Sequence, residues 1–193
     1  FQREFGVTCN EFWEPDVFGY SAALPQILRK AGIRNFLTIK LSWNQFNKLY
    51  IHTFWWEGLD GSKVLTHFPP ADTYNSMANV EEVLYSMTNY KDLDRSKEAY
   101  LLFGYGDGGG GPTREMLEQV SRMKDVDGLP RVEMRPANEF FTRLERDAKD
   151  LTTWVGELYF ELHRGTYTTQ ANNKRDNRLS EFMLHDVEFL SAV

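Results

Sequence analysis

The sequence predicts an α/β fold, and three observations support this. Strand-like and helix-like segments alternate through residues 1–150, as in a sheet whose strands are joined by helices. Asp60-Gly61 is a two-residue hairpin signal between the strand-like runs 54–59 and 63–68. The apolar run 100–105 is typical of a buried parallel strand. Together these patterns favour a mixed sheet covered by helices.

The expected elements follow in order along the chain. A strand over residues 8–13 precedes a helix over 22–31, and Gly19 allows a sharp turn between them. Asn79 is a suitable N-cap for the helix at 80–89, which has acidic residues in its first turn. Pro136 suits the start of a helix. The remaining expected strands are 36–41, 51–58, 63–68, 100–105 and 132–134, and the remaining helices are 113–124 and 136–149.

The pattern changes after Trp154. Leu158, Phe160 and Leu162 alternate as in a strand, and residues 169–192 have the apolar spacing of a long helix that could open a bundle. We therefore expect residues 1–150 to form the α/β part, and residues 151–193 to hold its end and the start of a helical domain. The chain does not begin with methionine, and we expect it to be a fragment of a longer protein.

Composition excludes several classes of protein. A net charge of -6 argues against nucleic-acid binding, because the phosphates would repel the chain. No apolar run is long enough to span a bilayer, so we expect no membrane partner. Cys9 is the single cysteine and no Asn-x-Ser/Thr acceptor occurs, which favours a reducing compartment. A cytoplasmic location is expected, with a vacuolar or lysosomal lumen as the alternative.

Two acidic residues lie where α/β folds place their chemistry, in loops that follow strands. Asp16 lies between the first strand and the first helix, with the aromatic residues Phe18 and Tyr20 beside it. The alternative role for Asp16 is an ordinary helix cap. Asp107 follows the run 100–105 in a glycine-rich loop that opens a helix. Such a loop could also cradle a phosphate, although no lysine stands in the P-loop position.

The chain resembles glycoside hydrolase family 38, the retaining α-mannosidases, and in particular their cytosolic/vacuolar subgroup (class IIC). The resemblance rests on several blocks that keep one order over nearly the whole chain. They are WEPDVFGYS at 13–21, LPQI at 24–27, FWWEG at 54–58, THFPP at 66–70, FGYGDGGGGPT at 103–113 and GELYFELHRGTYT at 156–168.

The resemblance implies a fold and a catalytic nucleophile. It implies a seven-stranded α/β barrel followed by a three-helix bundle, of which this chain holds the later part of the barrel and the start of the helical domain. Asp16 matches the family's nucleophile, which also ligates a divalent metal, for which zinc and cobalt are both suitable. The family takes its other ligands from a His-x-Asp pair and a later histidine, which we expect outside this chain.

The resemblance also suggests further site residues. Asp107 is the best candidate for the general acid, although many relatives carry a second acid where this chain has Gly108, so Asp107 could instead position substrate hydroxyls. Phe18, Tyr74, Asn75 and His163 are expected to bind substrate. The alternatives are core packing for Phe18 and surface packing for Tyr74. His67 is expected to be structural rather than a metal ligand.

The implied function is that of a metal-dependent retaining α-mannosidase that removes terminal mannose from free, mannose-rich oligosaccharides. The first alternative is a catalytically impaired, carbohydrate-binding relative, and the Gly108 departure motivates it. The second is a hydrolase on the same barrel that acts on another α-linked sugar. The full-length protein could be a homo-oligomer, and this fragment alone is expected to be inactive.

Overall fold

The computed structural model describes residues 2–163 and 170–192. The chain divides into two compact units, Phe1–Glu161 and Leu162–Val193. The second unit contains helix α6 (Ala171–Ser191), whose apolar side chains, such as Phe182 and Leu190, are exposed. The expected helix at 169–192 is thereby observed, although Thr169 itself lies outside the described residues. Within the described ranges, no helix has the length and apolar character needed to cross a membrane.

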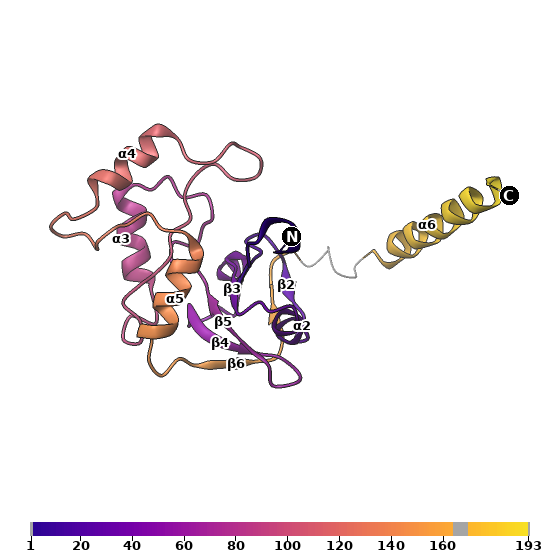
Figure 1. Cartoon of the computed structure of the whole chain (residues 1–193), viewed down its shortest axis with the longest axis horizontal. Coiled ribbons are helices and arrows are strands. Elements are labelled where there is room, and N and C mark those ends of the chain that lie inside the picture. The colour runs from indigo at the N-terminus through magenta and orange to yellow at the C-terminus, as the bar shows by residue number, and fades with distance from the viewer. Residues whose placement is uncertain (1, 164–169, 193) are drawn as a thin grey trace. The chain divides into compact units, whose positions relative to one another are not determined.

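The first unit is built around a mixed five-stranded sheet with the order β1-β3-β5-β4-β6 (Figure 1). Strands β1 (Glu11–Trp13), β3 (Asn35–Leu37) and β5 (Lys63–His67) run parallel, and β4 (Thr53–Glu57) pairs with β5 antiparallel. Strand β6 (Thr153–Val155) runs parallel to β4 at the far edge. A second, two-stranded sheet pairs β2 (Gly19–Tyr20) with β7 (Leu158–Tyr159).

The β4–β5 pair confirms the hairpin predicted from Asp60-Gly61. Asp60 Oδ1 accepts a hydrogen bond from the Ser62 amide at 3.0 Å, and Gly61 has a φ of 80°, which suits glycine. The register places Thr53 opposite His67 and Glu57 opposite Lys63. The residues of this turn therefore specify the β4–β5 pairing through interactions between neighbours in the sequence.

The helices also agree closely with the sequence pattern. They are α1 (Gln2–Phe5), α2 (Leu24–Lys30), α3 (Val80–Asn89), α4 (Arg114–Arg122) and α5 (Ala137–Asp147). Asn79 caps α3 by accepting from the Glu82 amide at 2.8 Å, as predicted. Thr113 caps α4 in the same way through the Met116 amide at 3.2 Å.

Successive residues of a strand point to opposite faces of the sheet. Helices cover both of these faces. One face carries Phe36, Phe54 and Trp56, which are fully buried against α2 and β7 in a cluster that includes Leu28 and Phe160. The opposite face carries Leu37 and Leu65, which pack on α5. In Figure 1, α5 and α2 accordingly lie on opposite sides of the strands.

Three of the predicted strands differ from the structure. The strand expected over 36–41 ends at Leu37, and residues Lys40–Trp43 form a 3-10 helix. The run 100–105 makes only isolated bridges: Leu102 and Gly104 bond to Ser76, and the Tyr100 amide donates to the His67 side chain at 3.1 Å. Residues 132–134 lie beside α4 without strand pairing, with Met134 exposed. The described residues form one five-stranded and one two-stranded sheet, so the seven-stranded barrel and the helix bundle stay predictions.

Candidate active site

Asp16 lies just beyond the carboxyl end of β1, in a loop that tertiary contacts hold. The Glu14 amide donates to Leu37 O at 3.1 Å, and the Tyr20 hydroxyl donates to Glu14 O at 2.6 Å. The same hydroxyl lies 2.6 Å from Thr38 Oγ1, so it ties the loop to the end of β3. Helix α2 begins after Ala23 with no side-chain cap, which removes the helix-capping role for Asp16.

Asp16 Oδ1 forms an ion pair with Lys40 Nζ. The Lys40 side chain is 5% exposed and that of Asp16 is 45% exposed. Lys40 comes from the 3-10 helix after β3, the parallel neighbour of β1, so both residues lie at the same edge of the sheet. Sequence reasoning missed Lys40 because it placed this residue within a strand; a lysine directly after a buried apolar run was the available signal.

Three aromatic rings surround the Lys40 ammonium. Its Nζ lies 3.9 Å from the Trp43 ring centroid, 5.6 Å from that of Tyr74 and 5.8 Å from that of Phe18. The Trp43 ring is 40% exposed and donates through Nε1 to Asp72 O at 2.9 Å. Trp43 is a second residue that sequence reasoning did not identify.

Phe18 lies at the edge of the core. Its ring stacks on Phe160 at a centroid distance of 5.6 Å, and Phe18 is only partly buried against that cluster. Phe18 therefore packs on the core on one side and borders Lys40 on the other, and its proposed contact with substrate stays a prediction.

Asp107 lies at the tip of a closed, glycine-rich loop. Tyr105 and Gly111 exchange two backbone hydrogen bonds, at 2.9 and 2.7 Å, which close the loop. Asp107 has a φ of 52°, a left-handed conformation that aspartate tolerates better than most residues. Its Oδ1 accepts from the Tyr74 hydroxyl at 3.2 Å, and its Oδ2 accepts from Asn75 Nδ2 at 3.4 Å.

Tyr74 connects the two carboxylates. Burial, the negative charge of Asp16 and the hydrogen bond to Asp107 raise the pKa of Tyr74 to about 12. The phenol therefore stays protonated near neutral pH and remains a hydrogen-bond donor. The Tyr74 hydroxyl bonds Asp107, and the Tyr74 ring lies 5.6 Å from the Lys40 ammonium that pairs with Asp16. The two acids, which are far apart in the sequence, therefore both lie near Tyr74.

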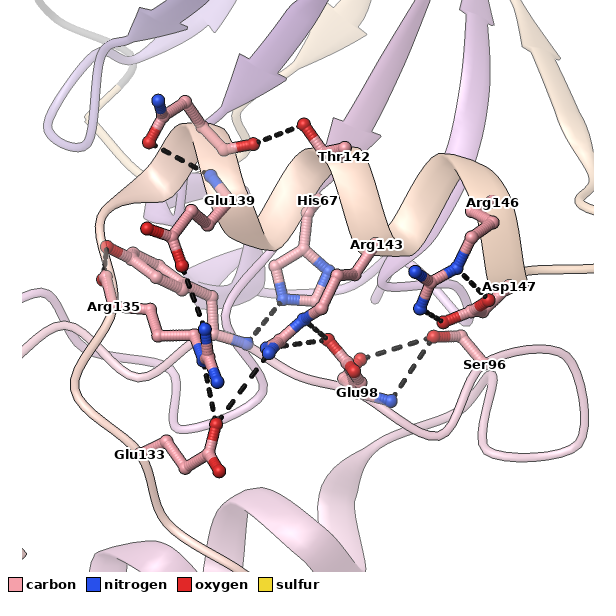
Figure 2. A network of polar contacts seen from close by, with 12 residues as sticks. His67, Ser96, Glu98, Glu133, Arg135, Glu139, Thr142, Arg143, Arg146 and Asp147 are labelled. Carbon is pink, nitrogen blue, oxygen red and sulfur yellow. Dashed lines mark hydrogen bonds and ion pairs between the residues drawn. The ribbon is translucent and has the colours of Figure 1, made fainter.

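The segment that leads to Asp107 is anchored to α5 by a polar network (Figure 2). Arg143 bonds Glu98 at 2.9 Å and lies 3.7 Å from Glu133. Arg135 pairs with Glu133 at 2.7 Å and with Glu139 at 2.9 Å. His67 lies beside this network in Figure 2, and its Nε2 accepts a hydrogen bond from the Tyr100 amide at 3.1 Å. The network fixes the approach of the chain to the glycine-rich loop that carries Asp107.

The two remaining histidine candidates have different surroundings. The His67 side chain is fully buried. Its Nδ1 lies 2.9 Å from Thr53 Oγ1, and its Nε2 accepts a hydrogen bond from the Tyr100 amide, so it has a structural role. His163 is exposed and belongs to the second unit, Leu162–Val193. Its proposed contact with substrate therefore stays a prediction.

The described residues do not form a complete metal site. No group of three or more His, Cys, Asp or Glu side chains lies together within residues 2–163 and 170–192. Asp16 can supply one oxygen ligand, whereas zinc or cobalt needs several at a fixed geometry. The remaining ligands of the expected ion would come from outside this chain.

Comparison with known proteins gives consistent matches. Residues 1–157 match the family model described as the glycosyl hydrolases family 38 N-terminal domain. The whole chain is 58% identical over 192 residues to "Alpha-mannosidase G" of Dictyostelium discoideum and 57% identical over 193 residues to "Alpha-mannosidase 2C1" of Mus musculus. It is 43% identical over 201 residues to "Alpha-mannosidase" of Saccharomyces cerevisiae.

The chain spans 18% of the first of these relatives and 19% of the other two. Among solved structures, an alpha-mannosidase from Enterococcus faecalis V583 superposes with a TM-score of 0.60 at 17% identity, over 81% of this chain and 19% of that one. At this identity the superposition supports the fold alone.

Proposed function

The chain belongs to glycosyl hydrolase family 38, and on this premise we propose that the full-length protein is a metal-dependent, retaining α-mannosidase. The names of its relatives support α-mannosidase activity. The observation that carries the assignment to this site is the position of Tyr74, which bonds Asp107 and whose ring lies 5.6 Å from the Lys40 ammonium that pairs with Asp16. A retaining glycosidase needs two carboxyl groups, about 5–5.5 Å apart in such enzymes.

In the proposed reaction, Asp16 attacks the anomeric carbon of a terminal mannose and forms a glycosyl ester. The bond to the leaving oxygen breaks at the same time, and Asp107 donates a proton to that oxygen. Water then attacks the anomeric carbon and gives a proton to Asp107, while the bond from that carbon to Asp16 breaks and Asp16 returns to a carboxylate. The 45% exposure of Asp16 leaves it accessible to a sugar.

A divalent metal, zinc or cobalt, is part of this proposal, with Asp16 as its one ligand in the described residues. Such an ion would hold and orient sugar hydroxyls. We further propose free, mannose-rich oligosaccharides as substrates and the cytoplasm as the location. The exposed, unpaired thiol of Cys9 suits a reducing compartment.

Azide rescue in the full-length protein tests the roles of the two carboxylates. With an activated aryl α-mannoside, Asp16→Gly should lose activity, and azide should restore turnover with a β-mannosyl azide as product. Asp107→Gly should instead give an α-mannosyl azide, because azide then attacks the glycosyl enzyme. Asp125→Gly, which removes an exposed carboxylate paired with Arg131 at 3.4 Å, is the control and should behave like the wild type.

The second candidate function is a carbohydrate-binding relative without turnover. The observation in its favour is Gly108, which lies next to Asp107 at a position with open space around it. Tight mannose binding by the metal-loaded wild type without hydrolysis of p-nitrophenyl α-mannoside would establish this alternative. Faster hydrolysis of an α-glucoside than of the α-mannoside would instead indicate a different glycosidase on the same scaffold.

A further inference from the structure

Lys40 is a buried cation beside the proposed nucleophile. Its side chain is 5% exposed, and its Nζ contacts Asp16 Oδ1. The rings of Trp43 and Tyr74 shield the ammonium from water. In the part of the chain that the structure describes, Asp16 is the carboxylate recorded within ion-pair distance of this lysine.

Burial of the Lys40 ammonium opposes stability, because it removes a charge from water while its partner Asp16 stays half-exposed. The aromatic faces recover part of this cost through cation–π contacts. A methionine at position 40 could fill the same space between Trp43 and Phe18. The fold thus holds a positive charge among aromatic rings, next to the proposed nucleophile.

The two half-reactions place opposite demands on such a charge. When Asp16 attacks the sugar, its negative charge is consumed as the ester bond forms. When water attacks the ester, the carbon–oxygen bond to Asp16 breaks and the electron pair returns to the carboxylate, while the water proton moves to the general base. A fixed cation at Oδ1 favours the second step, because negative charge develops next to it in the transition state.

Building on the proposed retaining function, we infer that Lys40 is a positioning residue that acts through Asp16 to promote breakdown of the glycosyl–enzyme ester. Its ammonium holds the carboxylate in place and stabilises Asp16 as the leaving group of the second step. Lys40 does not need to contact the sugar for this role.

The inference predicts a specific kinetic pattern in the full-length protein. Lys40→Met should slow ester breakdown about ten- to a hundred-fold, since a hydrogen bond to a charged group contributes about that factor. The ester then accumulates, so kcat and KM should fall together. The ratio kcat/KM depends on ester formation and should change by less than about threefold.

The experiment uses an aryl α-mannoside with a good leaving group in rapid-quench and steady-state assays. Lys40→Met should show a burst of about one aryl alcohol per active site, and the acid-quenched protein should be one mannosyl residue heavier by mass spectrometry. Lys40→Arg should recover most of kcat, since it restores the cation. Lys63→Met is the matched control, because Lys63 pairs with Glu57 at 3.0 Å on β4 but lies 45% exposed.

Thermal unfolding distinguishes a kinetic role from a structural one. Asp16 is half-exposed and can be solvated without its partner, so Lys40→Met should keep the melting temperature of the wild type or raise it. Equal losses of kcat and kcat/KM, or wild-type kinetics, would overturn the inference. So would a Lys40→Met protein that fails to fold, with no recovery of kcat in Lys40→Arg. A wild type without hydrolysis would reject the proposed function itself.

Discussion

Asn75 Oδ1 accepts a hydrogen bond from the Gly106 amide at 2.9 Å, and a Cβ built on Gly106 would lie 2.1 Å from this oxygen. Glycine is therefore required at position 106 because the Asn75 side chain approaches it closely. The backbone angles of Gly106 do not require glycine, since its φ is not positive. The contact matters because the other end of the Asn75 amide binds Asp107. One tight contact thus sets the position of the proposed general acid.

Gly106→Ala should lower kcat/KM by about ten-fold or more, because the new methyl group displaces Asn75 and with it the amide partner of Asp107. Steady-state kinetics of the full-length protein check this. Asn75→Ala removes the clash, so adding Gly106→Ala to that variant should cost much less than it does in the wild type. Additive losses in this double-mutant cycle would contradict the steric explanation.

Tyr74→Phe should reduce kcat by about ten- to a hundred-fold while the ring still covers Lys40, because only the donor to Asp107 is lost. Tyr85→Phe is the matched control, since its hydroxyl donates to Asp72 Oδ2 at 2.8 Å on the surface of α3. The pKa of each phenol is raised to about 12. Neither phenol ionises below about pH 10. Any loss of activity with rising pH below that value should therefore be the same in Tyr74→Phe as in the wild type.

Acid should destabilise the first unit through two buried histidines. Burial lowers the pKa of His52 from 6.5 to about 4 and that of His67 well below 6.5. Both rings are neutral in the folded protein, so their full contribution to stability is present above about pH 6.5. It is lost as the pH falls, because protons bind the unfolded chain first, and for His52 this loss continues down to about pH 4. The loss for His52 is on the order of 3 kcal/mol.

Melting temperatures measured between about pH 7 and pH 5 test this effect. His52→Asn keeps an acceptor for the Lys91 amide, which donates to His52 Nδ1 at 3.1 Å, but it does not titrate. This variant should lose part of the acid sensitivity. His185→Asn, at an exposed position on α6, should leave it unchanged. Equal pH dependence in all three proteins would refute the assignment to His52.

Asp92→Ala should destabilise the protein by about 3 kcal/mol without altering kcat per folded molecule. The Asp92 side chain is 1% exposed, and its Oδ2 accepts from the amides of His52 at 2.6 Å and Thr53 at 2.9 Å. Truncation leaves both amides buried without this partner. Asp94→Ala, at a neighbouring exposed position, is the control. Denaturant unfolding followed by tryptophan fluorescence measures the difference.

Local sequence determined most of the regular elements. Asn79 as a cap, Asp60-Gly61 as a turn and the helical spacing of residues 136–149 act over a few residues, and the structure confirms each of them. The α/β class followed from the same short-range signals. The position of Asp16 after a strand was visible in the same way, because a strand and the loop behind it are adjacent in the chain.

Only the tertiary structure decided which side chains meet. The run 100–105 has the composition of a strand, yet its amides bond to Ser76 and to the buried His67 ring, and it makes only isolated bridges. Lys40 becomes the partner of Asp16 because β1 and β3 lie side by side, and Tyr74, from a third segment, bonds Asp107 and borders Lys40. Local patterns encode backbone preference, whereas the charge and hydrogen bonding of a site depend on contacts between segments far apart in the chain.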